Sequence, residues 1–307
     1  MRILMMTAAA LAISACSARD VTKPADAPKV EPANILHISH GGIAYPDGDE
    51  LKRHWSNYTI NLIDGSQAYG WTSEDKISLP HDLLFELAGN AKVTGFALDS
   101  TFAPVEREDG SASNSPSGSP VRHFTLWTST QSRTGPWSKA YQGEAKANQR
   151  TAFTLPKPVE AHWLKLTVTD SWKGGAPVRL SEFEVHGSLD AKDAGAVADI
   201  TGYYSHEYGP IVLRQDGHLI HGCYNNGDGQ LEGLILGRVM RLAWYMSKEK
   251  SVGMATLVAG PDQLYGFWYR DQDRMGSPWN ATRVKDLSKV HLGPCESLLR
   301  RSPPRAM

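Results

Sequence analysis

The sequence predicts an all-β protein: a β-sandwich over residues 34–187, followed by a small antiparallel meander or barrel-like β domain over residues 200–284. Short runs of alternating apolar and polar residues recur along both regions, as at Leu164, Leu166 and Val168, with no long helical period. Turn residues, chiefly glycine, proline, serine and asparagine, interrupt these runs at short intervals. The 307 residues are enough for two domains of ordinary size.

The N-terminus has the pattern of an export signal. Arg2 precedes a short apolar run at residues 3–13, and small residues then lead to Cys16. This order is typical of a secretory signal peptide, here residues 1–15, and the run is too short to span a bilayer. The sequence Ile-Ser-Ala-Cys at its end resembles the bacterial lipobox, which implies that Cys16 is acylated. The alternative is an ordinary signal peptide in which this cysteine is incidental.

Acylation of Cys16 predicts an exported protein that is lipid-anchored in the bacterial cell envelope. Ser17, rather than aspartate, follows the cysteine, which resembles the pattern of outer-membrane sorting. Residues 16–33 are rich in alanine, proline, aspartate and lysine and have few large apolar side chains. This composition predicts a flexible tether between the lipid and the first domain.

Charge and cysteine content narrow the classes of partner. The formal net charge is −1 and no block of basic residues stands out, which argues against a nucleic acid partner.

With Cys16 assigned to lipid, Cys223 and Cys295 remain. An exported protein favours a disulfide between them, which would tie the tail, residues 285–307, to the second domain. The alternative is two separate buried thiols.

Several motifs in the first region carry a family resemblance. They are Asn-Leu-Ile-Asp-Gly at 61–65, Gly-Trp at 70–71, the block 153–166 ending in His-Trp-Leu-Lys-Leu, and Leu-Ser-Glu-Phe-Glu-Val-His-Gly at 180–187. In order and spacing they resemble the discoidin, or F5/8 type C, family, which implies a galactose-binding-like jelly roll. A long insertion at residues 103–120, rich in serine, glycine, proline and acids, departs from compact members of that family.

The second region repeats a short glycine-containing unit. Gly217-His218-Leu219 and Gly229-Gln230-Leu231 are two examples, and such similarity predicts successive hairpins of one meander. Glycine inside strands marks bends or close backbone approach, so a curled sheet or barrel is expected. The pattern loosely resembles up-and-down barrels of the lipocalin or avidin type, without a motif that assigns a family. Residues 188–199 are expected to form a linker, and the tail to be disordered beyond Cys295.

The discoidin resemblance implies a structural calcium ion. The matching ligands are Asp64 and Glu182, with backbone carbonyls near Asn61 and Ser66 as helpers. Calcium prefers six to eight hard oxygen ligands, which loop carbonyls and two carboxylates begin to supply. The alternative is that Asp64 caps a turn with Gly65 while Glu182 pairs with a base. No other cofactor is expected.

Loops at one end of the sandwich are the expected ligand surface. Sugar recognition needs an aromatic platform for the ring and polar groups for its hydroxyls. Trp71 and Trp163 are expected in the core instead. The loop aromatics and polar partners predicted to bind ligand are Tyr69, His81, Phe102, Arg107, Arg122 and Trp172.

These features predict a non-enzymatic, membrane-tethered binding protein. Its discoidin-like domain is expected to recognise carbohydrate or another surface ligand. Nucleophile-elbow, kinase, phosphate-loop and zinc-protease motifs are absent from the sequence. Two alternatives stay open: a structural or assembly lipoprotein that binds another envelope protein, and a hydrolase with its site between the domains.

Overall fold

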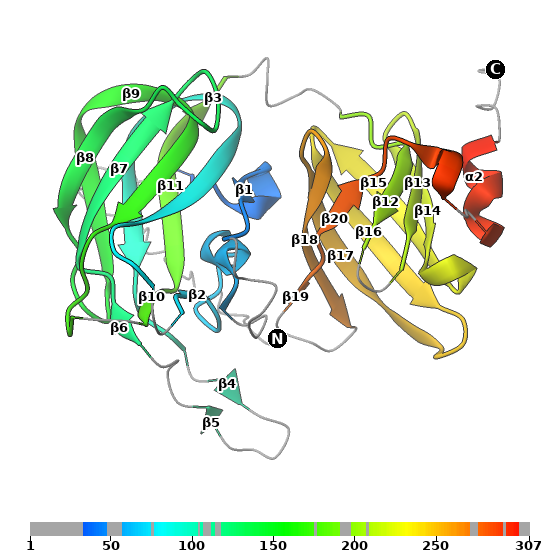
Figure 1. Cartoon of the computed structure of the whole chain (residues 1–307), viewed down its shortest axis with the longest axis horizontal. Helices are drawn as coiled ribbons and strands as arrows, with labels where there is room; N and C mark the ends of the chain where they lie inside the picture. The colour runs from blue at the N-terminus through cyan, green and yellow to red at the C-terminus, as the bar shows by residue number, and fades with distance from the viewer. Residues whose placement is uncertain are drawn as a thin grey trace, which may run out of the picture. The chain divides into compact units, whose positions relative to one another are not determined.

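The first domain is built around two long antiparallel strands, β3 (His81–Asp99) and β9 (Arg150–Val168) (Figure 1). They lie in a sheet of order β1-β3-β9-β7-β8, in which β11 also pairs with β3. The other strands of this sheet are β1 (Ile43–Ala44), β7 (His123–Ser129), β8 (Ser138–Glu144) and β11 (Glu182–Leu189). The computed structural model describes residues 33–47, 57–74, 77–103, 105–106, 112–113, 118–174, 177–190, 198–206, 209–270, 276–290 and 293–300.

A smaller sheet completes the sandwich. Its order is β2-β10-β6, with β2 (Trp71–Thr72), β10 (Val178–Leu180) and β6 (Ser119–Pro120). Inside the 103–120 insertion, β4 (Val105–Glu106) pairs with β5 (Ala112–Ser113). The all-β jelly roll predicted for this region is therefore confirmed.

The alternating pattern in the sequence places large apolar side chains between the sheets, because successive strand residues face opposite sides. Phe96, which is fully buried, is the centre of an aromatic cluster. Its ring centroid lies 4.9 Å from that of Phe153 and 5.8 Å from that of Phe124. Trp71 is fully buried, as predicted. Trp163 is not in the core as expected: it is half-buried and stacks on His162, with ring centroids 3.8 Å apart, because its strand neighbour Leu164 takes the inward face.

The second domain is a closed antiparallel barrel (Figure 1). Strands β12 to β18 follow one another around it, β20 lies between β12 and β18, and pairing of β17 with β18 closes the ring. The strands are β12 (Gly202–Ser205), β13 (Ile211–Asp216), β14 (Leu219–Tyr224), β15 (Gly229–Leu236), β16 (Val239–Met246), β17 (Ser251–Ala259), β18 (Gln263–Arg270), β19 (Ser277–Pro278) and β20 (Ala281–Arg283). The barrel-like prediction is confirmed.

Short helical segments lie between and after the strands. They are η1 (Ile38–His40), η4 (Thr59–Ile63), η5 (Asn225–Gly227), η6 (Leu287–Lys289), η7 (Gly293–Cys295) and α2 (Glu296–Arg300). No helix within the described ranges is long and apolar enough to cross a membrane. Cys16 and the tether lie outside the described residues.

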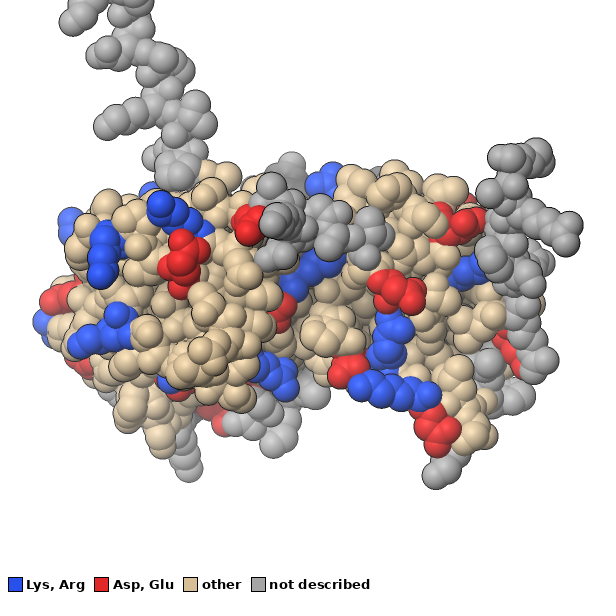
Figure 2. Space-filling view, turned by 90° about the horizontal axis from the view of Figure 1, so that it is seen from above, with Lys and Arg blue, Asp and Glu red and all other residues tan. Residues whose placement is uncertain are grey.

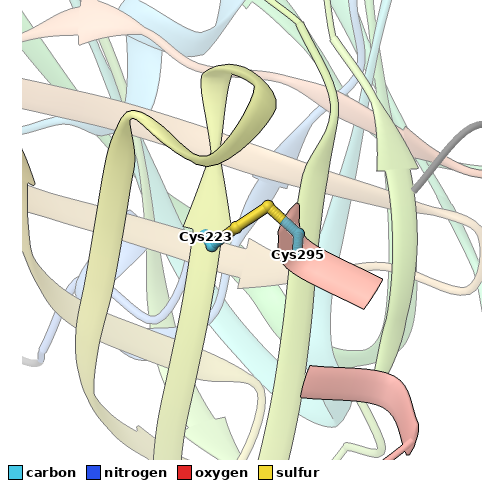
Figure 3. The surroundings of a disulfide bond; sticks show 2 residues. All are labelled: Cys223 and Cys295. Carbon is cyan, nitrogen blue, oxygen red and sulfur yellow. A yellow bond between two sulfur atoms is a disulfide. The ribbon is translucent and has the colours of Figure 1, made fainter. Parts of the chain in front are cut away.

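A disulfide joins Cys223 in β14 to Cys295 at the end of η7, with the two Cα atoms 5.8 Å apart (Figure 3). The predicted pairing is thus confirmed. The expectation of disorder beyond Cys295 is wrong for residues 296–300, which form α2 and pack against β13. The covalent link holds this segment against the barrel, so a helix too short to be stable alone can form there.

The two domains share a buried ion pair. Arg238, in the turn between β15 and β16, donates from Nη1 to Glu86 Oε1 of β3 at 2.5 Å. Its Nε donates to the Gly41 carbonyl at 2.6 Å and its Nη2 to the Leu87 carbonyl at 2.8 Å. Burial opposes ionisation of Glu86, but hydrogen bonding to His162 and the charge of Arg238 outweigh it and lower the pKa of Glu86 to about 2.

Apolar side chains accompany this pair. Val258, Tyr265 and Phe267 from the barrel belong to the same buried cluster as the core of the sandwich. The ring of Tyr265 meets that of Tyr45 edge-on, with centroids 5.6 Å apart.

The linker between the domains is shorter than expected, because β11 runs to Leu189 rather than ending at residue 187.

The surface mixes both signs of charge. Figure 2 shows lysine and arginine interspersed with aspartate and glutamate on the face that it presents. Neither sign of charge forms a broad area on that face.

Candidate functional site

Trp172 is the most exposed tryptophan among the described residues, with 39% of its surface accessible. It follows the isolated bridge between Val121 and Ser171, in the loop that leads from β9 to β10. Its backbone N–H donates to the Pro120 carbonyl at 3.1 Å, and its indole Nε1 donates to the Ala145 carbonyl at 2.9 Å. Because the backbone N–H and the indole N–H are both hydrogen-bonded, the ring is held in one orientation at the surface.

Four polar side chains form a charged network that reaches this indole through Arg122. The guanidinium carbon of Arg122 lies 4.7 Å from the ring centroid of Trp172. Arg122 Nε also donates to Glu144 Oε1 at 3.1 Å. The two ring nitrogens of His123 face the carboxylates of Asp170, at 3.2 Å, and Glu144, at 3.5 Å. We call Arg122, His123, Glu144, Asp170 and Trp172 the Trp172 cluster.

The Trp172 cluster combines a fixed aromatic surface with charged hydrogen-bonding groups. All five side chains are between one third and one half exposed. The pKa of Asp170 is lowered, first by the Ser171 N–H that its side chain accepts and then by His123, so this carboxylate is ionised at neutral pH. An indole in contact with a guanidinium that is itself paired to a carboxylate suits a ligand with an apolar ring face and hydroxyl groups around its edge.

Phe102 and Tyr69, also predicted, lie on loops of the first domain. Phe102 is half-buried, and the guanidinium carbon of Arg179 lies 4.9 Å from its ring centroid. Arg179 Nη2 donates to Asn148 Oδ1 at 2.8 Å, while its buried Nε and Nη1 have no partner among the described residues. Asn148 follows Ala145 on the loop that anchors Trp172, so Phe102 and Arg179 border the same loop. Tyr69 is half-buried, next to Gly70, which Phe102 approaches.

His81 is placed differently. Its ring stacks on the buried indole of Trp71, with centroids 5.6 Å apart and planes inclined by 13°. Its Nε2 lies 2.9 Å from Asp47 Oδ2, which also accepts the Trp71 indole N–H at 3.3 Å. These contacts bind His81 into the packing around Trp71. Arg107 lies outside the described residues.

The structure therefore brings Arg122 and Trp172 together, whereas sequence reasoning missed His123, Glu144, Asp170 and Arg179. A signal existed for Arg179, which is a charge within the apolar run Val-Arg-Leu of β10. No comparable signal marks Glu144 and Asp170. They come from the end of β8 and from the loop after β9, and only the fold makes them neighbours.

Asp64 and Glu182, the predicted calcium ligands, form a buried carboxylate pair. Glu182 is 5% exposed, and neither of its carboxylate oxygens has a hydrogen-bond partner among the described residues. Asp64 Oδ1 accepts the Ser66 N–H at 2.7 Å. Burial raises the pKa of Asp64 to about 6, and burial together with the charge of Asp64 raises the pKa of Glu182 well above its usual range.

Two buried carboxyl groups with raised pKa values need a compensating cation or a proton. The carboxylate oxygens of Glu182, which have no hydrogen-bond donor among the described residues, are of the hard type that calcium prefers, and backbone carbonyls of the surrounding loop are the kind of ligand that would complete its shell. Within the described part of the chain, no group of three or more His, Cys, Asp or Glu side chains is placed to hold a metal. The described side chains offer an ion two carboxylates at this place, and carboxylate oxygen is a donor type that calcium prefers.

No protein-family model and no curated protein matches this chain. Several solved structures match its first domain. The family 32 carbohydrate-binding module of NanJ from Clostridium perfringens, in complex with galactose, has 18% identity and a TM-score of 0.38 over 51% of this chain and 98% of that module. A second Clostridium perfringens module, in complex with GalNAc-beta-1,3-galactose, has 14% identity and a TM-score of 0.39 over 50% of this chain and 99% of the module.

The family 32 carbohydrate-binding module of EndoD from Streptococcus pneumoniae has 18% identity and a TM-score of 0.35, over 51% of this chain and all of that module. These matches cover nearly whole modules and about half of this chain. Identities below 20% and TM-scores below 0.4 make these distant similarities. The barrel has no family assignment.

Proposed function

We propose that this protein is a non-enzymatic binding protein of the bacterial cell envelope, anchored through a lipid on Cys16, whose first domain binds carbohydrate at the Trp172 cluster. The observation that carries the proposal is the geometry of Trp172: its indole is fixed by the Ala145 carbonyl, is 39% exposed, and is contacted by Arg122, whose guanidinium pairs with Glu144. A sugar ring can pack against the indole while its hydroxyls bond to the charged groups.

A glycan array tests this function. The protein, supplied with calcium, is expected to bind at least one glycan, and galactose and GalNAc-containing glycans should be included because the modules of similar fold were solved with them. Trp172→Ala is expected to lose that signal, because aromatic anchors commonly carry most of the binding energy of a site. Tyr245→Ala is a matched control, since Tyr245 is equally exposed, at 40%, but lies on the barrel. A folded protein that binds no glycan contradicts the proposal.

We also propose that calcium bound by Asp64 and Glu182 stabilises the loops of the first domain. Folding raises the pKa of both carboxyls, so in the absence of calcium their contribution favours folding below about pH 4. That contribution is lost as pH rises through the folded-state pKa of Asp64, about 6. At higher pH, bound calcium would compensate the negative charges of Asp64 and Glu182 in place of the protons that they have lost. Its effect on the melting temperature is therefore expected to be larger at pH 7 than at pH 5.

Calorimetry with calcium or with a chelator tests this second proposal. At a hundredfold excess over its Kd, calcium is expected to add about 2.7 kcal/mol to the free energy of unfolding. Glu182→Gln is expected to abolish the gain and to melt higher than wild type in chelator at pH 7, because one of the two charges is gone. Glu184→Gln is the control: Glu184 pairs with Arg150 at 2.6 Å, so its loss should lower stability and leave the calcium gain intact. An equal calcium gain in Glu182→Gln would rule out this site.

A further inference from the structure

A pocket of about 460 Å³ opens at one end of the barrel. Its lining comes from strand ends and turns that meet there. They are Ile211 at the start of β13, Tyr224 at the end of β14, Met246 at the end of β16, Ser251 at the start of β17 and Arg270 at the end of β18. An eight-stranded barrel is just wide enough either to be filled by its own side chains or to hold one small ligand.

The two ends of the barrel interior differ in how they are filled. Near the β13–β14 and β15–β16 turns, Ile220, Ile235 and Met240 are fully buried and belong to the barrel core. The pocket lies at the other ends of these strands, where the core stops short of the opening. Its volume falls within the range of about 300–1,000 Å³ that is usual for small-molecule sites.

Three indoles line the pocket, those of Trp244, Trp268 and Trp279. Trp244 and Trp279 are each 5% exposed, and Trp268 is half-buried. Trp244 and Trp268 meet edge-on, with ring centroids 5.7 Å apart, and Tyr224 meets Trp279 in the same way at 5.4 Å. The Trp244 Nε1 donates to the Tyr269 carbonyl at 3.1 Å, which fixes its ring. These contacts form a rigid aromatic wall before any ligand arrives.

Two strand glycines make room for this wall. A Cβ at Gly253 in β17 would lie 2.5 Å from ring atoms of Trp244, and a Cβ at Gly229 in β15 would lie 2.2 Å from the ring of Tyr224. Neither distance is possible for real atoms, so larger residues at these positions would displace the rings. These two glycines thus give large aromatic rings room at the barrel mouth.

The polar groups of the pocket are sparse and together nearly neutral. Burial lowers the pKa of His206 to about 4, so its imidazole is uncharged at neutral pH. The exposed side chains of Glu249 and Arg270 carry opposite charges at the rim. The hydroxyl of Ser251 is buried in the wall and has no hydrogen-bond partner among the described residues.

We propose that the barrel pocket binds a small uncharged amphiphile, whose ring system packs against Trp244, Trp268 and Trp279 and whose hydroxyl or amide group lies at the polar rim. The aromatic wall favours a ring over a flexible chain because a rigid ring loses less conformational entropy on binding. The balanced rim charges favour an uncharged molecule, since an ionised group would be desolvated there without a net countercharge. This site is separate from the Trp172 cluster and does not depend on sugar binding.

N-phenyl-1-naphthylamine, an uncharged fluorescent compound with linked aromatic rings, is the probe. Its emission is expected to rise and saturate on titration into the protein, with energy transfer from the pocket tryptophans. Met246→Trp places a larger side chain in the pocket and is expected to weaken binding at least tenfold. Tyr245→Ala is the matched control, because its side chain points outward from the neighbouring position of β16 and is 40% exposed. It should bind the probe as wild type does.

Circular dichroism and thermal melting identify any variant that does not fold. If Met246→Trp does not fold, Trp268→Ala removes part of the wall and is expected to weaken probe binding by a similar factor. No saturable rise in emission with wild type would overturn the proposal. So would unchanged affinity in the folded pocket variant, or an equal loss in Tyr245→Ala. Glycan binding by Met246→Trp is expected to stay at the wild-type level, so the two proposals can fail separately.

Discussion

Replacing Arg238 with alanine is expected to lower the free energy of unfolding by about 3–5 kcal/mol. The change removes the guanidinium that bonds to Glu86 Oε1 and to the Gly41 and Leu87 carbonyls. Glu86, only 5% exposed, then keeps a charge in a buried place with its main countercharge gone. Urea denaturation followed by fluorescence measures the effect.

An exposed ion pair provides the control for Arg238→Ala. Lys285 Nζ lies 2.9 Å from Asp262 Oδ1, but the two side chains are 74% and 54% exposed. Lys285→Ala is expected to cost about 0–1 kcal/mol, because water replaces a surface partner at little cost. Equal stability changes for Arg238→Ala and Lys285→Ala would contradict the description of Glu86 and Arg238 as a buried pair that joins the domains.

Removing the disulfide by the double change Cys223→Ser and Cys295→Ser is expected to cost about 2–4 kcal/mol. The bond links residues separated by 72 positions and therefore restricts the unfolded chain strongly. It also holds α2 against β13, so the double variant should become sensitive to proteases near residues 296–300. Chemical denaturation and limited proteolysis measure the two effects.

Reduction of the wild-type protein offers a comparison for the double variant. Dithiothreitol is expected to lower wild-type stability to the level of the double cysteine variant and to leave that variant unchanged. If wild type and the double variant unfold at the same denaturant concentration, the disulfide does not stabilise the barrel. The statement that it holds α2 against β13 would then be wrong.

The strand pattern and the two cysteines were sufficient to predict the fold class and one covalent link. Alternation at Leu83, Phe85 and Leu87 predicts a buried face because neighbouring strand residues point in opposite directions, and all three side chains are buried. The disulfide between Cys223 and Cys295 could be predicted because an exported protein favours disulfides and because the assignment of Cys16 to lipid leaves only these two cysteines. The short helix α2 could not be predicted, because its five residues form a helix only where the disulfide holds them.

The candidate site was only partly predictable because its members come from distant segments. Trp172 and Arg122 stood out as an aromatic and a cation in loops. Glu144 is an ordinary exposed acid in the sequence, and only the pairing of β7 with β8 brings it next to His123. The Glu86–Arg238 pair spans 152 positions, and neither residue has a distinctive sequence context. Such contacts follow from tertiary packing, which local patterns do not encode.

The carbohydrate site that we propose is the Trp172 cluster. The most direct measurement is the binding isotherm of one array-selected glycan for wild type and for Trp172→Ala, at equal calcium concentration and with both proteins shown to be folded. We predict saturable binding by wild type and a loss of affinity of at least about 30-fold in the variant, corresponding to about 2 kcal/mol or more. Equal dissociation constants for the two proteins would contradict the claim, because the glycan would then bind at another place.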